Sequence, residues 1–106
     1  EMQRLAAHLG ADPATLAGLS GLGDLALTCH SDLSRNFRLG CALGAGTAPQ
    51  DGVTVEGVAT AAALARLAVS DVLDLPICTA VDRIASGGDA PEAAMRRLLD
   101  RPLKEE

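Results

Sequence analysis

The stretch VEGVATAAALARLAVSDVLD, residues 55 to 74, is the longest periodic segment of the chain and decides its fold. Apolar residues recur in it at intervals of three and four, which places them along one face of a helix. They are Val58, Ala61, Ala62, Ala65, Ala68, Val69 and Val72. Because Leu64 and Leu67 widen this face, we expect a buried central helix that meets water only around Arg66, Ser70 and Asp71.

Turn and cap residues divide the rest of the chain into shorter helices. Gly10 ends a first helix, and Asp12 followed by Pro13 begins a second, because an aspartate N-cap and a proline at the first helical position favour a helix start. Further helices are expected at 24–29, from 31–34 to 44–46, from Pro76 to the glycines at 87–88, and after a cap by Asp89 and Pro91. No segment alternates with a period of two, so strands are not expected. The sequence predicts an all-α bundle of about six helices.

Composition limits the class of protein. The 106 residues fit one domain, with a net charge of −5 and a single aromatic residue, Phe37. An acidic chain with almost no rings to stack on bases is not expected to bind nucleic acid. No apolar run reaches the ~20 residues of a membrane span, and no signal peptide is visible, so we expect a cytoplasmic protein.

The three cysteines, Cys29, Cys41 and Cys78, are widely spaced and form no metal-binding motif with the two histidines. We interpret them as buried or partly buried thiols, with a structural metal as the alternative. The first residues, EMQRLAAHLG, already have helical periodicity with no cap before them. We therefore interpret the chain as a domain of a longer protein.

Residues 18–40, GLSGLGDLALTCHSDLSRNFRLG, differ from the alanine- and leucine-rich remainder. The glycines of GLSGLG lack the order and the preceding strand of a dinucleotide-binding loop, so they predict a bend between helices. Asp24 follows this bend, either as an N-cap or as a carboxylate that binds a substrate hydroxyl or orients a catalytic ammonium group. Thr28 lies four residues later on the same helical face. His30 has no partner acid and is interpreted as a surface residue.

The segment SDLSRNFRLG, residues 31–40, has two interpretations. If Ser31, Asp32 or Ser34 caps a helix, Arg35 lies in its first turn, where a cation opposes the helix dipole by about 0.3–1 kcal/mol. A bound anion reverses that effect, and with Asn36 the segment forms a phosphate site. In the alternative, Asp32 and Arg35 simply pair on a solvated face.

Glu56 also has two interpretations, because it begins the central helix. Its carboxylate either complements the helix dipole or reaches a ribose hydroxyl. Spacing alone does not choose between them.

These segments together resemble a known family. Residues 18–40, with VEGVATA and LPICTAVDRI, are similar to the C-terminal domain of bacterial NAD(P)-dependent glycerol-3-phosphate dehydrogenase. The preceding LGADPATLAGLSGLGDL extends the similarity over nearly the whole chain. The resemblance implies a helical domain like those of two-domain enzymes related to 6-phosphogluconate dehydrogenase, which completes the substrate pocket of an N-terminal Rossmann domain. It implies the interconversion of dihydroxyacetone phosphate and sn-glycerol 3-phosphate with NAD or NADP, for glycerophospholipid synthesis.

The resemblance also assigns roles to residues. Asp24, with Thr28 as a weaker candidate, would support catalysis at the reacting end of the substrate. Ser34, Arg35 and Asn36 would bind the substrate, with Arg35 and Asn36 on its phosphate. The residues near the cofactor would be Arg35, Thr54 and Glu56. No metal is implied, and a homodimer is compatible with the family.

The family's catalytic lysine and glycine-rich cofactor loop are absent from these 106 residues, whose single lysine is Lys104 in the tail. We therefore expect the isolated domain to be inactive. Two alternatives stay open: a non-catalytic helical module whose Arg35 and Arg38 bind an acidic partner, and a related dehydrogenase with another substrate.

Overall fold

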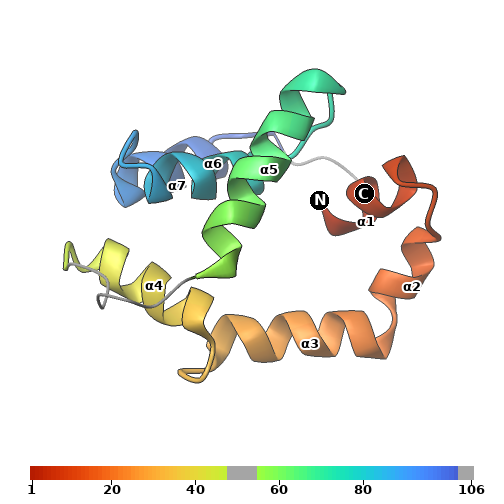
Figure 1. Cartoon of the computed structure of the whole chain (residues 1–106), viewed down its shortest axis with the longest axis horizontal. Helices are drawn as coiled ribbons and strands as arrows, with labels where there is room; N and C mark the ends of the chain where they lie inside the picture. Colours follow the sequence, from red (N-terminus) through yellow and green to blue (C-terminus); the bar gives the residue numbers. More distant parts are fainter. Residues whose placement is uncertain (48–54, 103–106) are drawn as a thin grey trace.

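The computed structural model describes residues 1–47 and 55–102, and within these ranges the chain forms seven α-helices and no strands. The expected all-α fold is confirmed, with one helix more than the approximate number (Figure 1). The helices are α1 (Met2–His8), α2 (Pro13–Ala17), α3 (Leu19–His30), α4 (Arg35–Gly44), α5 (Glu56–Ser70), α6 (Pro76–Ala85) and α7 (Pro91–Leu99). None of these helices is long and apolar enough to cross a membrane.

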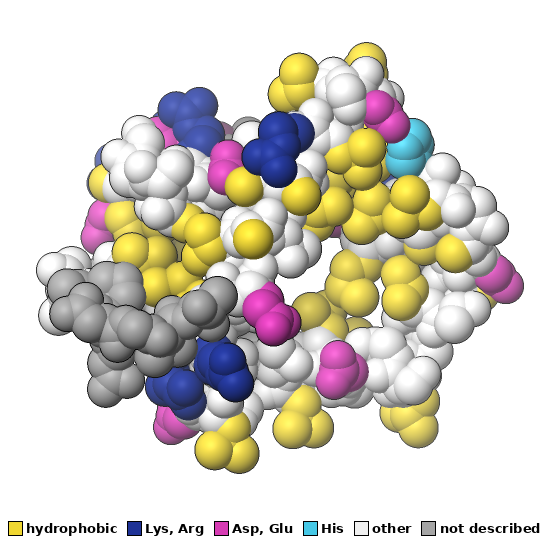
Figure 2. Space-filling view, in the orientation of Figure 1, with side chains coloured by type: hydrophobic (Ala, Val, Ile, Leu, Met, Phe, Trp, Pro, Cys, Tyr) yellow, Lys and Arg dark blue, Asp and Glu magenta, His cyan; other side chains and the backbone are white. Residues whose placement is uncertain are grey.

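The helices form an open arc rather than a filled bundle. α1 packs against α2, α2 against α3 and α3 against α4, while α5 packs on α6, α6 on α7, and α7 on α4 (Figure 1). In the space-filling view an opening remains in the middle of the molecule, with apolar side chains on its border (Figure 2). The radius of gyration, 14.4 Å, exceeds the roughly 13 Å of a compact domain of this length.

The core of this arc is small. The buried apolar residues among those described are Ala6, Ala61, Leu75 and Ala94. The accessible surface of 7642 Å² is well above the roughly 5,500 Å² of a folded monomer of this mass. Large apolar side chains such as Leu19 and Leu33 are about nine-tenths exposed, at 92% and 89%. The described chain therefore leaves much apolar surface without cover.

The expectation of a buried central helix at residues 55–74 is wrong. Of the residues in α5, Ala61 alone is buried, and Val69 is 82% exposed. The helix also ends at Ser70, before Val72, which is 92% exposed. The periodicity is real, but α6 covers one side of α5 and no other described helix encloses the rest.

Local start and stop signals are confirmed at several positions. Gly10 adopts φ +77° after α1, a left-handed conformation that favours glycine. The carboxylate of Asp12 accepts a hydrogen bond from Ala14 N at 2.9 Å, and Pro13 begins α2. Asp89, expected to cap the last helix, instead pairs with arginine side chains, and Ala90 occupies the cap position without a side-chain bond.

The glycine bend predicted at residues 18–23 is confirmed only at Gly18, which lies between α2 and α3, because α3 runs through Gly21 and Gly23. A Cβ on Gly21 would lie 3.0 Å from the Cα and carbonyl carbon of Leu16 and closer still to its oxygen. This glycine therefore allows α3 to approach α2 closely rather than to bend. As a consequence Asp24 lies inside the helix and does not cap it.

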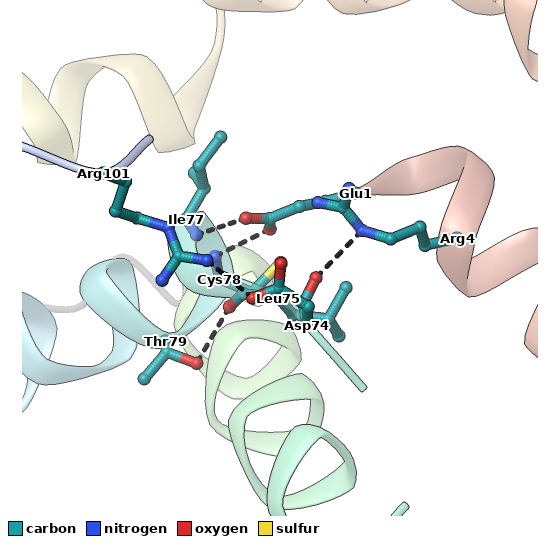
Figure 3. A network of polar contacts seen from close by, with 8 residues as sticks. All are labelled: Glu1, Arg4, Asp74, Leu75, Ile77, Cys78, Thr79 and Arg101. Carbon is teal, nitrogen blue, oxygen red and sulfur yellow. Dashed lines mark hydrogen bonds and ion pairs between the residues drawn. The ribbon is translucent and has the colours of Figure 1, made fainter. Parts of the chain in front are cut away.

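A polar network joins the first residues to α6, although the two are far apart in sequence (Figure 3). The Glu1 carboxylate accepts hydrogen bonds from the backbone N–H groups of Ile77 and, at 3.1 Å, of Cys78. These N–H groups lie in the first turn of α6, which has no side-chain cap of its own. Glu1 thus satisfies donors that a helix start leaves open.

The same network extends to the segment before α6. Arg4 Nε donates to the carbonyl oxygen of Asp74 at 3.0 Å. The side chain of Asp74 pairs with Arg101 at 2.8 Å (Figure 3). The start of the chain, the α5–α6 connection and the segment after α7 are therefore held together.

Candidate functional site

The candidate site begins at the first turn of α4. Ser34 is the N-cap, and its hydroxyl oxygen accepts a hydrogen bond from Phe37 N at 3.2 Å. Arg35 is consequently the first residue of the helix, as one of the sequence interpretations required. Figure 2 shows basic side chains gathered at this end of α4. The first turn holds no acidic residue to balance them.

The two arginines of this turn differ in their contacts. Arg38 Nη1 donates to the carbonyl oxygen of Asp32 at 2.6 Å and thus holds the turn between α3 and α4. Arg35 is exposed and has no hydrogen bond or ion pair with any residue in the described ranges. The pair between Asp32 and Arg35 is therefore not formed there. A guanidinium at a helix start, without a carboxylate partner, is well suited to an anion.

Asn36 connects this turn to α5. Its Oδ1 accepts a hydrogen bond from Gly57 N at 3.2 Å, across 21 positions in the sequence. The N-cap of α5, Val55, provides no side-chain bond, so Asn36 takes the place of a cap. Glu56 precedes Gly57 and is an exposed acidic residue in the first turn of α5. The structure thus brings Asn36 next to the start of the helix that carries Glu56.

Gly57 is not among the site residues predicted from the sequence, and its hydrogen bond to Asn36 adds it to the site. The signal was a glycine at the second position of a helix, where it weakens the helix without serving a turn. Thr54, the other predicted cofactor residue, lies outside the described residues.

Asp24 and Thr28 lie on α3, both exposed. No hydrogen bond or ion pair links them to Ser34, Arg35 or Asn36 within the described chain. They lie on the helix that directly precedes the α4 turn. His30 Nδ1 lies 3.0 Å from the carbonyl oxygen of Ala26 on an exposed face, in keeping with a surface role.

An apolar pocket of about 300 Å³ lies beside Asn36. Its walls come from α4, α5, α6 and Pro91. A larger pocket of about 530 Å³ lies between α6 and α7 and includes no residue of α4. The smaller pocket is the one adjacent to the predicted site residues.

Two of the three cysteines differ from the prediction of buried or partly buried thiols. Cys29 and Cys41 are exposed, and Cys78 is half-buried. Burial raises the pKa of the Cys78 thiol to about 11, and the neighbouring Glu1 carboxylate acts in the same direction. This thiol is therefore protonated at neutral pH and is a poor nucleophile.

With this geometry established, similarities to known proteins define the family. The family model described as "NAD-dependent glycerol-3-phosphate dehydrogenase C-terminus" matches residues 1–96. The chain is 60% identical over its whole length to a glycerol-3-phosphate dehydrogenase [NAD(P)+] of Cereibacter sphaeroides, and 56% identical to that of Roseobacter denitrificans. The chain belongs to the family of C-terminal domains of NAD-dependent glycerol-3-phosphate dehydrogenases.

A solved structure agrees with this assignment. The crystal structure of glycerol-3-phosphate dehydrogenase from Coxiella burnetii matches 92% of the chain with a TM-score of 0.82 and 37% identity. The match covers 32% of that protein. Likewise, the chain spans only 35% and 33% of the two bacterial relatives named above.

Proposed function

We propose that this chain is the substrate-binding C-terminal domain of an NAD(P)-dependent glycerol-3-phosphate dehydrogenase, which interconverts dihydroxyacetone phosphate and sn-glycerol 3-phosphate for glycerophospholipid synthesis. The observation that carries the proposal is Arg35, an exposed cation at the start of α4 with no partner in the described chain. Such a cation opposes the helix dipole until an anion binds. A substrate phosphate is an anion of the right size and charge.

Three residues of the α4 turn would hold this phosphate. Arg35 supplies paired N–H donors, and Asn36 and Ser34 supply further donors on the same turn. The cap bond to Phe37 N uses an oxygen lone pair of Ser34, so its O–H proton is available to the ligand. Fixing one end of a small substrate restricts the position of its reacting carbon, which converts binding energy into orientation.

Asp24 would act at the other end of the substrate. Its exposed carboxylate on α3 would orient the catalytic lysine that the remainder of the protein provides, with Thr28 on the same face. Because no hydrogen bond or ion pair joins Asp24 to the α4 turn in the described chain, the substrate itself would join the two groups. The isolated domain lacks the lysine and would not catalyse the reaction.

The cofactor would lie near Glu56 and Arg35, together with Thr54. NAD or NADP supplies the hydride when bound. The exposed carboxylate of Glu56, at the start of α5, fits a role as acceptor for a ribose hydroxyl. Its neighbour Gly57 contacts Asn36, so the proposed cofactor and phosphate groups are adjacent.

The exposed apolar surface supports a role as part of a larger protein, which we propose to be cytoplasmic. We propose that exposed side chains such as Leu22 and Leu25 of α3 pack against an N-terminal Rossmann domain, or against a second subunit in a homodimer. Exposed apolar side chains that gather into a patch mark interaction sites.

A steady-state assay of the full-length protein tests the function. NADH or NADPH oxidation should depend on dihydroxyacetone phosphate and saturate with it. The comparison of the two reduced cofactors gives the cofactor preference, and the isolated 106-residue domain serves as the inactive control. Absence of substrate-dependent oxidation with both cofactors would contradict the proposal.

A further inference from the structure

We propose that Gly57 is a positioning residue of the phosphate site: its backbone N–H fixes the side-chain amide of Asn36 with the NH2 group turned toward the ligand, and its lack of a Cβ makes room for that amide. This inference rests on the proposed function. It adds a residue that contacts no substrate itself and acts through Asn36.

The first step concerns the direction of the amide. A side-chain amide has an acceptor end, Oδ1, and a donor end, Nδ2, whereas a backbone N–H is a donor only. The contact of 3.2 Å between Gly57 N and the Asn36 side chain therefore requires Oδ1 to face Gly57. Nδ2 has no partner among the residues in the described ranges. Its N–H groups are available to a ligand that accepts hydrogen bonds.

This orientation determines the kind of ligand that the site prefers. A phosphate offers only acceptor oxygens at the site once it is ionised, so it matches both Nδ2 of Asn36 and the guanidinium of the preceding residue, Arg35. An amide in the opposite orientation would present a carbonyl oxygen and repel the same phosphate. Gly57 thus sets the hydrogen-bonding polarity of the site.

The second step concerns space. A Cβ built at position 57 would lie 2.7 Å from Cγ of Asn36 and 3.1 Å from Nδ2, with Oδ1 closer still. The separation from Cγ is shorter than non-bonded carbon atoms make, and that from Nδ2 is unusually tight, so the Asn36 side chain would have to shift. That side chain is exposed, so it can shift into solvent without disturbing a packed core. The change would therefore move the site without unfolding the chain.

Helix α5 itself would be more stable with alanine than with glycine at position 57. Alanine is favoured over glycine in a helix interior, and Gly57 has no positive φ that requires glycine. The contact with Asn36 explains the glycine at this position.

The test uses Gly57→Ala in the full-length protein. We expect the KM for dihydroxyacetone phosphate to rise about tenfold or more, with a smaller change in kcat, because phosphate anchoring is weakened while the reacting end is unchanged. Gly44→Ala is the matched control: it lies at the end of α4, and its added Cβ meets nothing within 4 Å. Its kinetics should equal those of the unmodified protein.

The Asn36→Asp variant tests the donor role of Nδ2 separately from the role of Oδ1 as a cap for α5. The aspartate still accepts the hydrogen bond from Gly57 N, so the melting temperature should not fall, but it presents oxygen in place of the Nδ2 donor. We expect the KM to rise as in Gly57→Ala. An unchanged KM in Gly57→Ala, with normal activity of the unmodified protein, would overturn the role of Gly57 alone. Absence of activity in the unmodified protein would instead overturn the proposed function.

Discussion

Asp89 and Arg83 form an ion pair that joins α6 to the segment before α7, with Arg83 Nη2 3.0 Å from Asp89 Oδ1. Arg97 donates to the other carboxylate oxygen. The Asp89 side chain is 8% exposed, whereas both arginine side chains are 57% exposed. A nearly buried carboxylate with two outer partners therefore links three segments of the chain.

Replacing Asp89 by alanine should lower the free energy of unfolding by about 1–3 kcal/mol, because both arginines lose a charged hydrogen-bond acceptor that water replaces only in part. The measurement is equilibrium unfolding of the full-length protein in urea. Glu92→Ala is the control, since it removes an exposed negative charge from the same end of α7. Equal losses in the two variants would show that only the helix dipole is involved.

Gly21→Ala should destabilise the protein by about 1–3 kcal/mol through overpacking. The added Cβ would meet the backbone of Leu16, which cannot move aside as a side chain does. Gly23→Ala, two positions along the same helix, meets nothing within 4 Å and should stabilise by about 0.5–1 kcal/mol. Urea unfolding of both variants gives the comparison, and a gain in stability from both would refute the packing role of Gly21.

These two glycines also show what the sequence could not predict. A run of glycines suggests a bend, but the reason for Gly21 is a contact with Leu16 in another helix. Caps and breaks such as Ser34 and Pro76 were predictable because their causes lie within a few residues. The burial of α5 was overestimated because periodicity shows which face of a helix is able to pack, and not whether anything covers it.

The candidate site likewise has a part that the local sequence predicts and a part that depends on contacts between helices. The cap at Ser34 and the position of Arg35 follow from the local pattern around residues 31–40. The bond between Asn36 and Gly57 joins positions 21 apart, so it depends on how α4 meets α5. No pattern within a few residues of Asn36 or Gly57 predicts how these two helices lie relative to each other.

The Cys78 thiol should react with iodoacetamide at a half-maximal rate near pH 11, because burial and the Glu1 carboxylate raise its pKa. Mass spectrometry of the peptide that contains Cys78 measures this rate in the full-length protein. Glu1→Gln should move the midpoint to lower pH, since the negative charge is removed. A midpoint near the ordinary value of 9.0 in the unmodified protein would contradict the environment described here.

The same shift affects stability. A thiol with a higher pKa in the folded than in the unfolded state contributes fully below the unfolded pKa of 9.0, and this contribution is lost as the pH rises toward 11. The unmodified protein should therefore lose stability between these pH values more steeply than Cys78→Ala. Equal slopes in the two proteins would show that Cys78 does not titrate differently on unfolding.

The central claim, that Arg35 binds the phosphate of the substrate, is tested most directly by comparing two substrates in one variant. The full-length protein and its Arg35→Ala variant are assayed with dihydroxyacetone phosphate and with dihydroxyacetone, which lacks the phosphate. We predict that the substitution lowers kcat/KM for the phosphorylated substrate about a hundredfold and lowers kcat/KM for dihydroxyacetone far less, because that substrate has no phosphate for Arg35 to bind and is affected only through the proposed position of Arg35 near the cofactor. Equal losses with both substrates, or no loss with the phosphorylated one, would contradict the claim.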